Sequence, residues 1–280
     1  MILIADSGST KTDWAALHNG QVLARVHTRG MNPFFQTPEQ MRKEIQETLI
    51  PQLPQLPVTA VHFYGAGCTP EKCAEVAQTL TSALEVQGGV EVHSDMVGAA
   101  RGLCGRHKGI VCIMGTGSNS CLYDGTGVVA NVSPLGFILG DEGSGAVLGK
   151  LLVADLLKNQ LGDELKQEFL EQYKLTPADV IDRVYRQPFP NRFLASLSPF
   201  VAAHLNHPGI RSMVGDSFVA FLRRNVMQYA GCQELPVHFV GSVAWYYQSL
   251  LHEAAQECGL RMGQIMKAPM DGLISYHSQC

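Results

Sequence analysis

Two short glycine-rich segments have the composition of turns that bind an anionic oxygen. Gly115-Thr116-Gly117-Ser118-Asn119 follows the apolar run 110–114, and Asp6-Ser7-Gly8-Ser9-Thr10-Lys11 follows the apolar run 2–5. Both segments offer backbone N–H groups, hydroxyl groups and little side-chain bulk, and glycine lets the backbone come close to a bound group. A polar hairpin turn is the alternative for either segment alone. Because the pattern occurs twice, we favour a pair of phosphate-binding turns.

The elements that would position the first turn alternate between strands and helices. Asn19-Gly20 predicts a tight hairpin, because a type I′ turn needs positive φ at both positions. Met41, Ile45 and Leu49 recur at helical spacing, and Pro38 suits the first turn of that helix. We expect strands at 2–6, 12–17, 22–26, 58–64 and 90–93, and helices at 38–50, 70–86 and 96–103.

The same order begins again after a short polar link from Gly105 to Lys108. We expect strands at 110–114, 119–123, 128–132, 236–240 and 261–266, helices at 142–159 and 244–258, and an inserted, mostly helical block at about 160–230. The repetition indicates an internal duplication. It predicts an α/β fold of mixed sheets covered by helices, with two domains, 1–106 and 107–280, around a cleft.

Composition argues against several classes of function. The formal net charge is −4 and there is no basic cluster, which disfavours nucleic acid as a partner. No apolar run approaches the roughly 20 residues of a membrane helix, and the first residues lack the basic region of a signal peptide. We therefore expect a cytoplasmic protein that does not bind membranes.

The cysteines and histidines do not form a recognisable metal or disulfide pattern. None of the eight cysteines forms a C-x-x-C pair, so we interpret them as reduced core residues. His204 and His207 are the only close pair of histidines, and they lack a neighbouring cysteine or carboxylate at ligand spacing. Neither residue type predicts a metal centre.

The combination of motifs resembles a known family. Gly115-Thr-Gly-Ser-Asn119 paired with Gly140-Asp-Glu-Gly-Ser144 is similar to the N-acetylglucosamine kinases of the BadF/BadG/BcrA/BcrD ATPase-type family. Asp6-Ser-Gly-Ser-Thr-Lys-Thr12 resembles the opening turn of that family. The resemblance implies the duplicated ribonuclease H-like (actin-like ATPase) fold of sugar kinases, Hsp70 and actin. It also implies ATP and Mg²⁺ as cofactors and a small sugar as acceptor, and it leaves a homodimer open.

The resemblance assigns one group of residues to ATP. Gly8, Ser9, Thr10 and Lys11 would bind phosphates from one side, and Thr116 and Gly117 from the other. Asp6 would orient hydrated Mg²⁺, which prefers one or two carboxylates together with water and phosphate oxygens. Gly241 and Ser242 fall where the superfamily binds adenosine, although a simple strand-to-helix turn explains them nearly as well.

A second group would bind the acceptor. Asp95, between a predicted strand and a predicted helix, corresponds to the base that accepts a proton from the attacking hydroxyl group, or it only caps the helix. Asn32 and Asp141 match residues that bind the sugar, but a turn before Pro33 and a cap on the helix from Glu142 are the alternatives. The remaining residues that the resemblance places on the acceptor side are Ser118, Asn119, Leu135 and Gly136.

Two departures from the family pattern bear on the acceptor and on the domains. The animal N-acetylglucosamine kinases tend to carry Gly-Trp-Gly where this chain has Pro134-Leu135-Gly136, so an aromatic wall for the sugar or its acetyl group is missing. Chains of the family usually end in a helix that returns to the first domain. Only a short tail follows 268–272 here, so we expect that helix to be absent or shortened.

Three classes of function remain. The first is an ATP-dependent kinase of an amino sugar such as N-acetylglucosamine. The second is an ATPase that drives a partner enzyme, like the activators of 2-hydroxyacyl-CoA dehydratases, which share an iron–sulfur cluster between two subunits. The chain shows no activator-like cysteine context after the second turn, because Cys112 and Cys121 fall inside predicted strands. The third is a nucleotide sensor without catalysis, for which Asp95 and Asp141 would be unneeded.

Overall fold

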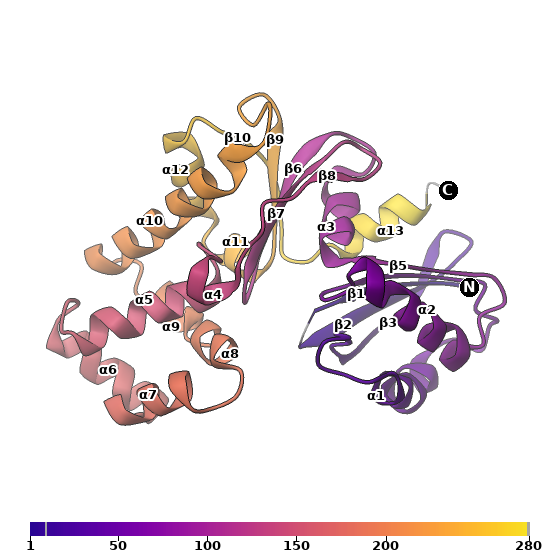
Figure 1. Ribbon diagram of the computed structural model, residues 1–280, viewed down its shortest axis with the longest axis horizontal. Coiled ribbons are helices and arrows are strands. Elements are labelled where there is room, and N and C mark those ends of the chain that lie inside the picture. The colour runs from indigo at the N-terminus through magenta and orange to yellow at the C-terminus, as the bar shows by residue number, and fades with distance from the viewer. Residues whose placement is uncertain (9, 279–280) are drawn as a thin grey trace. The chain divides into compact units, whose positions relative to one another are not determined.

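Two five-stranded mixed sheets with the same strand order form the framework of the chain (Figure 1). The structure is a computed structural model, and it describes residues 1–8 and 10–278. The chain divides into two units. The first contains residues 1–107, 125–127 and the segment from Ala268 onward, and the second contains residues 108–124 and 128–267.

The sheet of the first unit has the order β3-β2-β1-β4-β5. Its strands are β1 (Ile2–Ser7), β2 (Lys11–His18), β3 (Gln21–Arg29), β4 (Ala60–Gly65) and β5 (Gly89–Ser94). The first three strands pair antiparallel, whereas β4 is parallel to both β1 and β5. Asn19 and Gly20 have φ values of 50° and 76°, so the predicted hairpin turn between β2 and β3 is confirmed.

Side chains along a strand point alternately to the two faces of the sheet, and both faces of this sheet are buried. Leu3 and Phe63 pack with the helices on one face, which are α1 (Pro38–Glu44), the π-helical turn η1 (Ile45–Leu49), the 3₁₀ turn η2 (Ile50–Gln52) and α2 (Pro70–Leu84). Ile4 and Tyr64 face the other side, which is covered by α3 (Asp95–Cys104) and α13 (Met270–Ser278). Because both faces are covered, the central strands β1 and β4 are apolar at most positions.

The C-terminal segment corrects one expectation from the sequence. Instead of a short tail, residues 270–278 form helix α13, and it lies beside α3 in the first unit (Figure 1). Met270 and Leu273 are buried against the sheet, and the Tyr64 hydroxyl group is 2.8 Å from His277 Nε2. The division at residue 106 placed this segment in the second domain, whereas its contacts belong to the first unit.

The second sheet repeats the first. Its order, β8-β7-β6-β9-β10, again has the first three strands antiparallel and the fourth and fifth parallel. The strands are β6 (Gly109–Met114), β7 (Ser118–Tyr123), β8 (Val128–Ala130), β9 (Pro236–Val240) and β10 (Arg261–Met266). The predicted α/β fold with an internal duplication is therefore confirmed.

Helices of the second unit enclose a large apolar core around α5. Ala146, Leu148, Leu152 and Leu156 of this helix are fully buried. The helices are α4 (Gly136–Leu139), α5 (Gly145–Leu157), α6 (Asp163–Tyr173), α7 (Pro177–Tyr185), α8 (Pro190–Ala195), α9 (Ser198–Ala203), α10 (Pro208–Arg224), the 3₁₀ turn η3 (Val226–Gln228), α11 (Ser242–Tyr246) and α12 (Gln248–Glu257). The predicted helix 142–159 thus begins three residues later, and the predicted helix 244–258 is interrupted at Tyr247.

Two further features concern the chain as a whole. The seven cysteines in the described part of the chain are free, and five of them are buried. Among the residues described, none of the helices has the length and apolar character required to span a membrane.

Two helical glycines test the packing of α5. A methyl group at Gly149 would overlap the carbonyl oxygen of Leu194 on α8, whereas a methyl group at Gly215 on α10 would meet nothing within 4 Å. We expect Gly149→Ala to lower the free energy of unfolding by more than about 2 kcal/mol. Gly215→Ala should raise it by about 0.5–1 kcal/mol, because alanine loses less backbone entropy. Denaturant titration measures both, and equal responses would contradict this close contact.

Candidate functional site

Parallel pairing brings two acidic residues of the first unit to one edge of the sheet. Ser7, Gly65 and Ser94 lie side by side at the carboxyl ends of β1, β4 and β5. Asp6 precedes Ser7 and Asp95 follows Ser94, so both carboxyl groups lie at this edge. Burial, and after it the neighbouring charge of Asp95, raises the pKa of Asp6 to about 7. Two carboxyl groups in one partly desolvated place make a candidate site for acid–base or cation chemistry.

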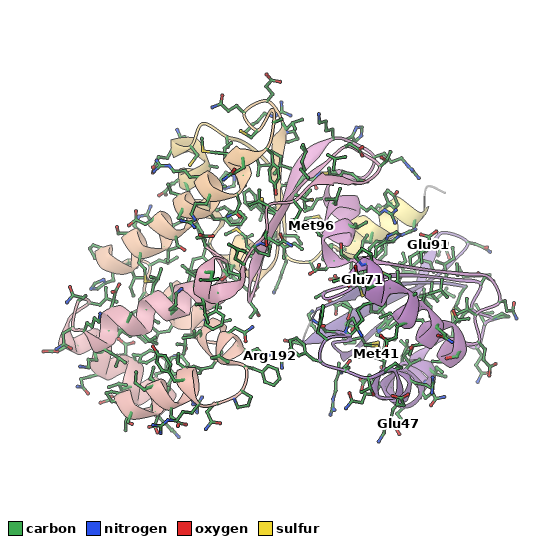
Figure 2. The ribbon with its side chains drawn as sticks, viewed as in Figure 1. Met41, Glu47, Glu71, Glu91, Met96 and Arg192 are labelled. Atoms are coloured by element: carbon green, nitrogen blue, oxygen red, sulfur yellow. The ribbon has the colours of Figure 1, made fainter. Side chains whose placement is uncertain are left out.

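Asp95 begins α3 but does not cap it. The N-cap is Ser94, whose hydroxyl group accepts a hydrogen bond from the backbone N–H of Val97. The interpretation of Asp95 as only a helix cap is therefore wrong. Asp95 Oδ1 accepts a hydrogen bond of 2.9 Å from the backbone N–H of Met96, which is labelled in Figure 2 at the start of α3. Burial raises the pKa of Asp95, and this hydrogen bond opposes the shift.

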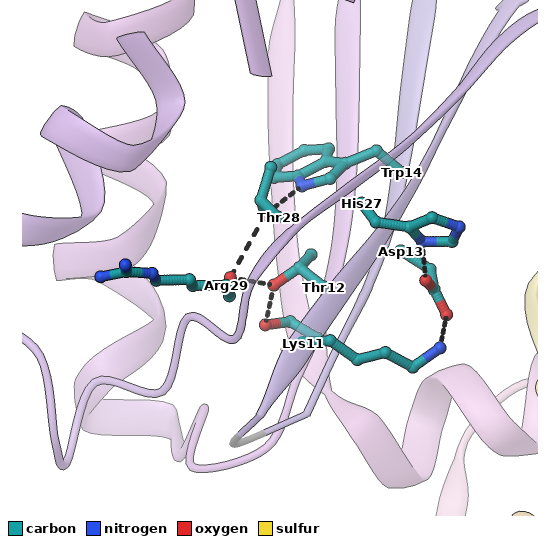
Figure 3. Close-up of polar contacts among 8 residues, drawn as sticks. Lys11, Thr12, Asp13, Trp14, His27, Thr28 and Arg29 are labelled. Carbon is teal, nitrogen blue, oxygen red and sulfur yellow. Dashed lines mark hydrogen bonds and ion pairs between the residues drawn. The ribbon is translucent and has the colours of Figure 1, made fainter. Parts of the chain in front are cut away.

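The neighbours of Asp6 fit a divalent cation. Asp13 lies opposite Asp6 on β2, and its carboxylate forms ion pairs with Lys11 and His27 (Figure 3). Asp6 has the charges of Asp95 and Asp13 near it, and the Lys11 ammonium lowers its pKa by less than they raise it. A cation would relieve this repulsion. In the described part of the chain no three His, Cys, Asp or Glu side chains form a metal cage, but Mg²⁺ needs only one or two carboxylates.

The turn between β1 and β2 has an exposed tip on a well-bonded base. The backbone N–H of Gly8 donates to the carbonyl oxygen of Lys11 at 2.9 Å, and the Ser7 and Thr12 hydroxyl groups are 2.7 Å apart. Gly8 and Thr10 are exposed at the tip. The predicted phosphate residue Ser9 lies outside the described residues. Lys11 points back along β2, where its ammonium group lies 2.8 Å from Asp13.

Asn32 is buried beside a glycine that the sequence did not single out. Its Oδ1 accepts a hydrogen bond of 3.0 Å from the backbone N–H of Phe34, so the predicted turn at this position is confirmed. Gly67, in the turn after β4, packs directly on the Asn32 amide and the Phe34 ring, leaving no room for a side chain. Cys68 follows; burial raises the pKa of its thiol, and the nearby charges of Cys73 and Asp95 contribute in the same direction. The glycine pair Gly65 and Gly67 after a strand was the signal that could have found this turn.

Three segments of the second unit converge at the carboxyl ends of β6 and β9. The backbone N–H groups of Gly145 and Ala146, at the start of α5, donate to the carbonyl oxygens of Gly115 and Thr116 at 2.8 and 3.0 Å. Gly241 has a φ of 124° and packs on the backbone of Met114 and Gly115. The structure therefore brings the predicted phosphate residues Thr116 and Gly117 together with the predicted adenosine turn at 241–242.

Asp141 lies directly against the second glycine turn. Its Oδ2 is 2.9 Å from the position that a Cβ atom on Gly117 would take. The backbone of Asp141 has a positive φ of 53°. The backbone N–H of Asp141 donates to the carbonyl oxygen of Pro134 at 3.0 Å. Burial raises the pKa of Asp141 to about 6, and a hydrogen bond from the backbone of Ser118 opposes the shift. The N-cap of α5 is Ser144, so the interpretation of Asp141 as the cap is wrong.

The other predicted acceptor residues differ in their surroundings. The Ser118 hydroxyl group donates to the carbonyl oxygen of Glu142 at 2.8 Å, so it ties the loop that contains Asp141 and Glu142 to β7. Asn119 Oδ1 accepts from the Ser120 backbone and from Asn131. Leu135 is 59% exposed and begins, with Gly136, the short helix α4. Ser118 and Asn119 therefore bond to protein groups, while Leu135 presents an apolar side chain to its surroundings.

The duplicated sheet topology with a glycine turn after the first strand of each sheet defines the class of sugar kinases and actin-like ATPases. A crystal structure of a candidate N-acetylglucosamine kinase from Porphyromonas gingivalis is 51% identical to the chain, with a TM-score of 0.97, and the match covers 100% of this chain and 99% of that one. The chain belongs to the N-acetylglucosamine kinase family.

More distant proteins share part of the sequence or the fold. The N-acetylmuramic acid/N-acetylglucosamine kinase of Clostridium acetobutylicum is 27% identical over 207 residues, which span 70% of this chain and 68% of that protein. A ROK family glucokinase from Streptomyces griseus, solved with glucose and AMPPNP, shares the fold with a TM-score of 0.60 at 14% identity, and the match covers 100% of this chain and 98% of that one. No protein-family model matches the chain.

The first site prediction concerns Asp95. Asp95→Asn should leave ATP binding intact and lower turnover by about 10²–10⁴-fold, because the amide cannot accept the proton of an attacking hydroxyl group. Turnover and nucleotide affinity are measured separately. Glu91→Gln is the matched control, since Glu91, which is labelled in Figure 2, lies on β5 before the same helix. Its carboxylate pairs with His62. Near-normal turnover of Asp95→Asn defeats the assigned role.

The second site prediction concerns the pH dependence of stability. The pKa of Asp141 rises from its ordinary value of 3.8 to about 6 on folding. The native state therefore binds more protons than the unfolded state in this window, and the stabilisation is lost as pH rises through about 6. Asp141→Asn removes this contribution. We expect the melting temperature of the variant, relative to the parent, to increase between about pH 4.5 and pH 8; a constant difference contradicts the shift.

Proposed function

We propose that the chain is an ATP-dependent kinase that transfers the γ-phosphate of ATP to a hydroxyl group of an amino sugar such as N-acetylglucosamine. The observation that carries the proposal is the acidic edge of Asp6 and Asp95 in a chain that matches a candidate N-acetylglucosamine kinase over its full length at 51% identity. A sugar kinase needs these two carboxyl groups, one for the cation that accompanies ATP and one for the acceptor hydroxyl group.

The proposed roles follow the contacts of each residue. Backbone N–H groups around Gly8 and Thr10, and those around Thr116 and Gly117, bind phosphate oxygens. Such positioning and charge neutralisation supply most of the catalysis in phosphoryl transfer. Mg²⁺, when bound, neutralises charge on the phosphates, and Asp6 is the residue that would hold its hydration shell.

The acceptor side uses three further residues. Asp95 accepts the proton of the attacking hydroxyl group, and its raised pKa brings it nearer to the pH at which a base is most effective. Asp141 accepts hydrogen bonds from sugar hydroxyl groups, and Asn32 orients the sugar from a turn that is rigidly bonded. Phe34 is 61% exposed and packs on Gly67 next to Asn32, so its ring offers an apolar surface beside Asn32.

The alternative of an ATPase that activates a partner enzyme has less support. An iron–sulfur cluster shared between two subunits needs cysteines that reach the protein surface. Cys112 and Cys121, which flank the second glycine turn, are both 0% exposed and lie on the neighbouring strands β6 and β7. The homodimer and the cytoplasmic location stay predictions.

A coupled assay of ADP release tests the proposal. With Mg-ATP, we expect little hydrolysis alone and rapid ADP release with an N-acetylated amino sugar, because an acceptor is required to complete the site. The panel should include free amino sugars and neutral hexoses, and mass spectrometry should identify the phosphorylated sugar. Equal ADP release with and without every sugar supports the partner-driving ATPase and overturns the kinase.

A further inference from the structure

The loop that carries Asp141 holds this residue in a left-handed conformation. Its φ of 53° is in a region where L-residues other than glycine are uncommon, although aspartate adopts it more often than most. Such a conformation persists only where the surrounding contacts determine it. The contacts that hold residues 141–143 therefore decide where the Asp141 carboxyl group lies.

Two of these contacts come from α10. The backbone N–H of Gly143 donates to Ser217 Oγ at 2.9 Å in a buried position, and Arg224 Nε lies 2.6 Å from Glu142 Oε1. Ser217 and Arg224 are two helical turns apart, and so lie on the same face of α10. A third contact, from the Ser118 hydroxyl group to the carbonyl oxygen of Glu142, joins the loop to β7. The two residues that follow Asp141 are thus bonded on both sides.

The ion pair differs from the other arginine pairs on the surface. Arg224 is 64% exposed, but the Glu142 side chain is only 18% exposed, whereas Arg223 and its partner Glu257 on α12 are 59% and 57% exposed. Water and salt therefore screen the Glu142–Arg224 pair less. The negative charge of Glu142 also raises the pKa of Asp141, so a cation on Glu142 works against that influence.

We infer that Arg224 and Ser217 are positioning residues for acceptor binding, because they hold residues 142–143 and thereby keep the Asp141 carboxyl group beside the second glycine turn. The inference rests on the proposed function, in which Asp141 binds the sugar. Without the pair, Asp141 can relax toward an unstrained φ, and its carboxyl group then leaves Gly117. The loss falls on the acceptor and leaves ATP binding unchanged, since the turn at 115–117 keeps its bonds from Gly145 and Ala146.

Arg224→Ala tests the inference, with Arg223→Ala as its matched control. Both substitutions remove an arginine–glutamate pair from the last turn of α10, but only one touches the loop. We expect Arg224→Ala to raise KM for the sugar about tenfold, the scale of one charge-assisted hydrogen bond, with KM for ATP within about twofold of the parent. Arg223→Ala should change neither constant. Equal effects of the two variants, or an equal rise in both KM values, overturns the inference.

Two additional variants separate the possible failures. Arg224→Lys keeps the charge and should recover part of the sugar affinity, and it serves as the test if Arg224→Ala does not fold. Asp141→Asn should raise KM for the sugar at least as much as Arg224→Ala. If Asp141→Asn has no effect, the acceptor role of Asp141 in the proposed function fails. If Asp141→Asn has its effect and both Arg224 variants have none, only the positioning role is overturned.

Discussion

Parallel pairing of strands is the constraint on which the candidate site depends. In the first unit β4 is parallel to β1 and β5, and in the second unit β9 is parallel to β6 and β10. The carboxyl ends of three strands therefore meet at one edge in each sheet, and the segments that leave these ends come together although they are distant in the chain. Helices cover both faces of the first sheet, so this edge is where polar groups can collect without breaking the core.

The polar groups that collect there are costly, and this cost argues for a function. Burial, together with the nearby charges of Asp95 and Asp13, raises the pKa of Asp6 to about 7, and burial also raises the pKa of Asp95. A fold selected only for stability would replace one of the two with a neutral residue. Asp13 shows the contrast, because Lys11 and His27 both pair with its carboxylate. The uncompensated acids lie at the strand ends, and the compensated acid lies one strand further out.

Local patterns predicted the framework well, and long-range contacts account for what they missed. The strands, the hairpin at Asn19-Gly20 and the duplicated order follow from alternation and turn residues, which act over a few positions. Helix α13 was missed because its stability comes from burying Met270 and Leu273 on a sheet formed by the start of the chain. Asp95 and Asp141 resemble helix caps in sequence, and only the backbone shows that the adjacent residues Ser94 and Ser144 act as caps.

The predictions of the site residues show the same division. The glycine turns could be predicted because their chemistry lies within six consecutive residues. The contacts that hold the site loops could not be predicted, because they join residues far apart in the chain. Gly67 contacts Asn32, and Arg224 contacts Glu142. The sequence of one chain, read by itself, gives no signal for such pairs. The inserted helical block around α10, which carried no motif, thus proves to contain the residues that hold the Asp141 loop.

The duplication extends from the sheets to the site. Each glycine turn joins the first and second strands of its sheet. Asn32 and Asp141 each follow the third strand, and Gly65-Ala66-Gly67 and Gly241-Ser242 each follow the fourth. The equivalence ends at the fifth strand. Asp95 follows β5, whereas β10 leads to Ala268 and to α13 in the first unit. The two halves therefore share a scaffold, and in the proposed function only the first half supplies a base, Asp95.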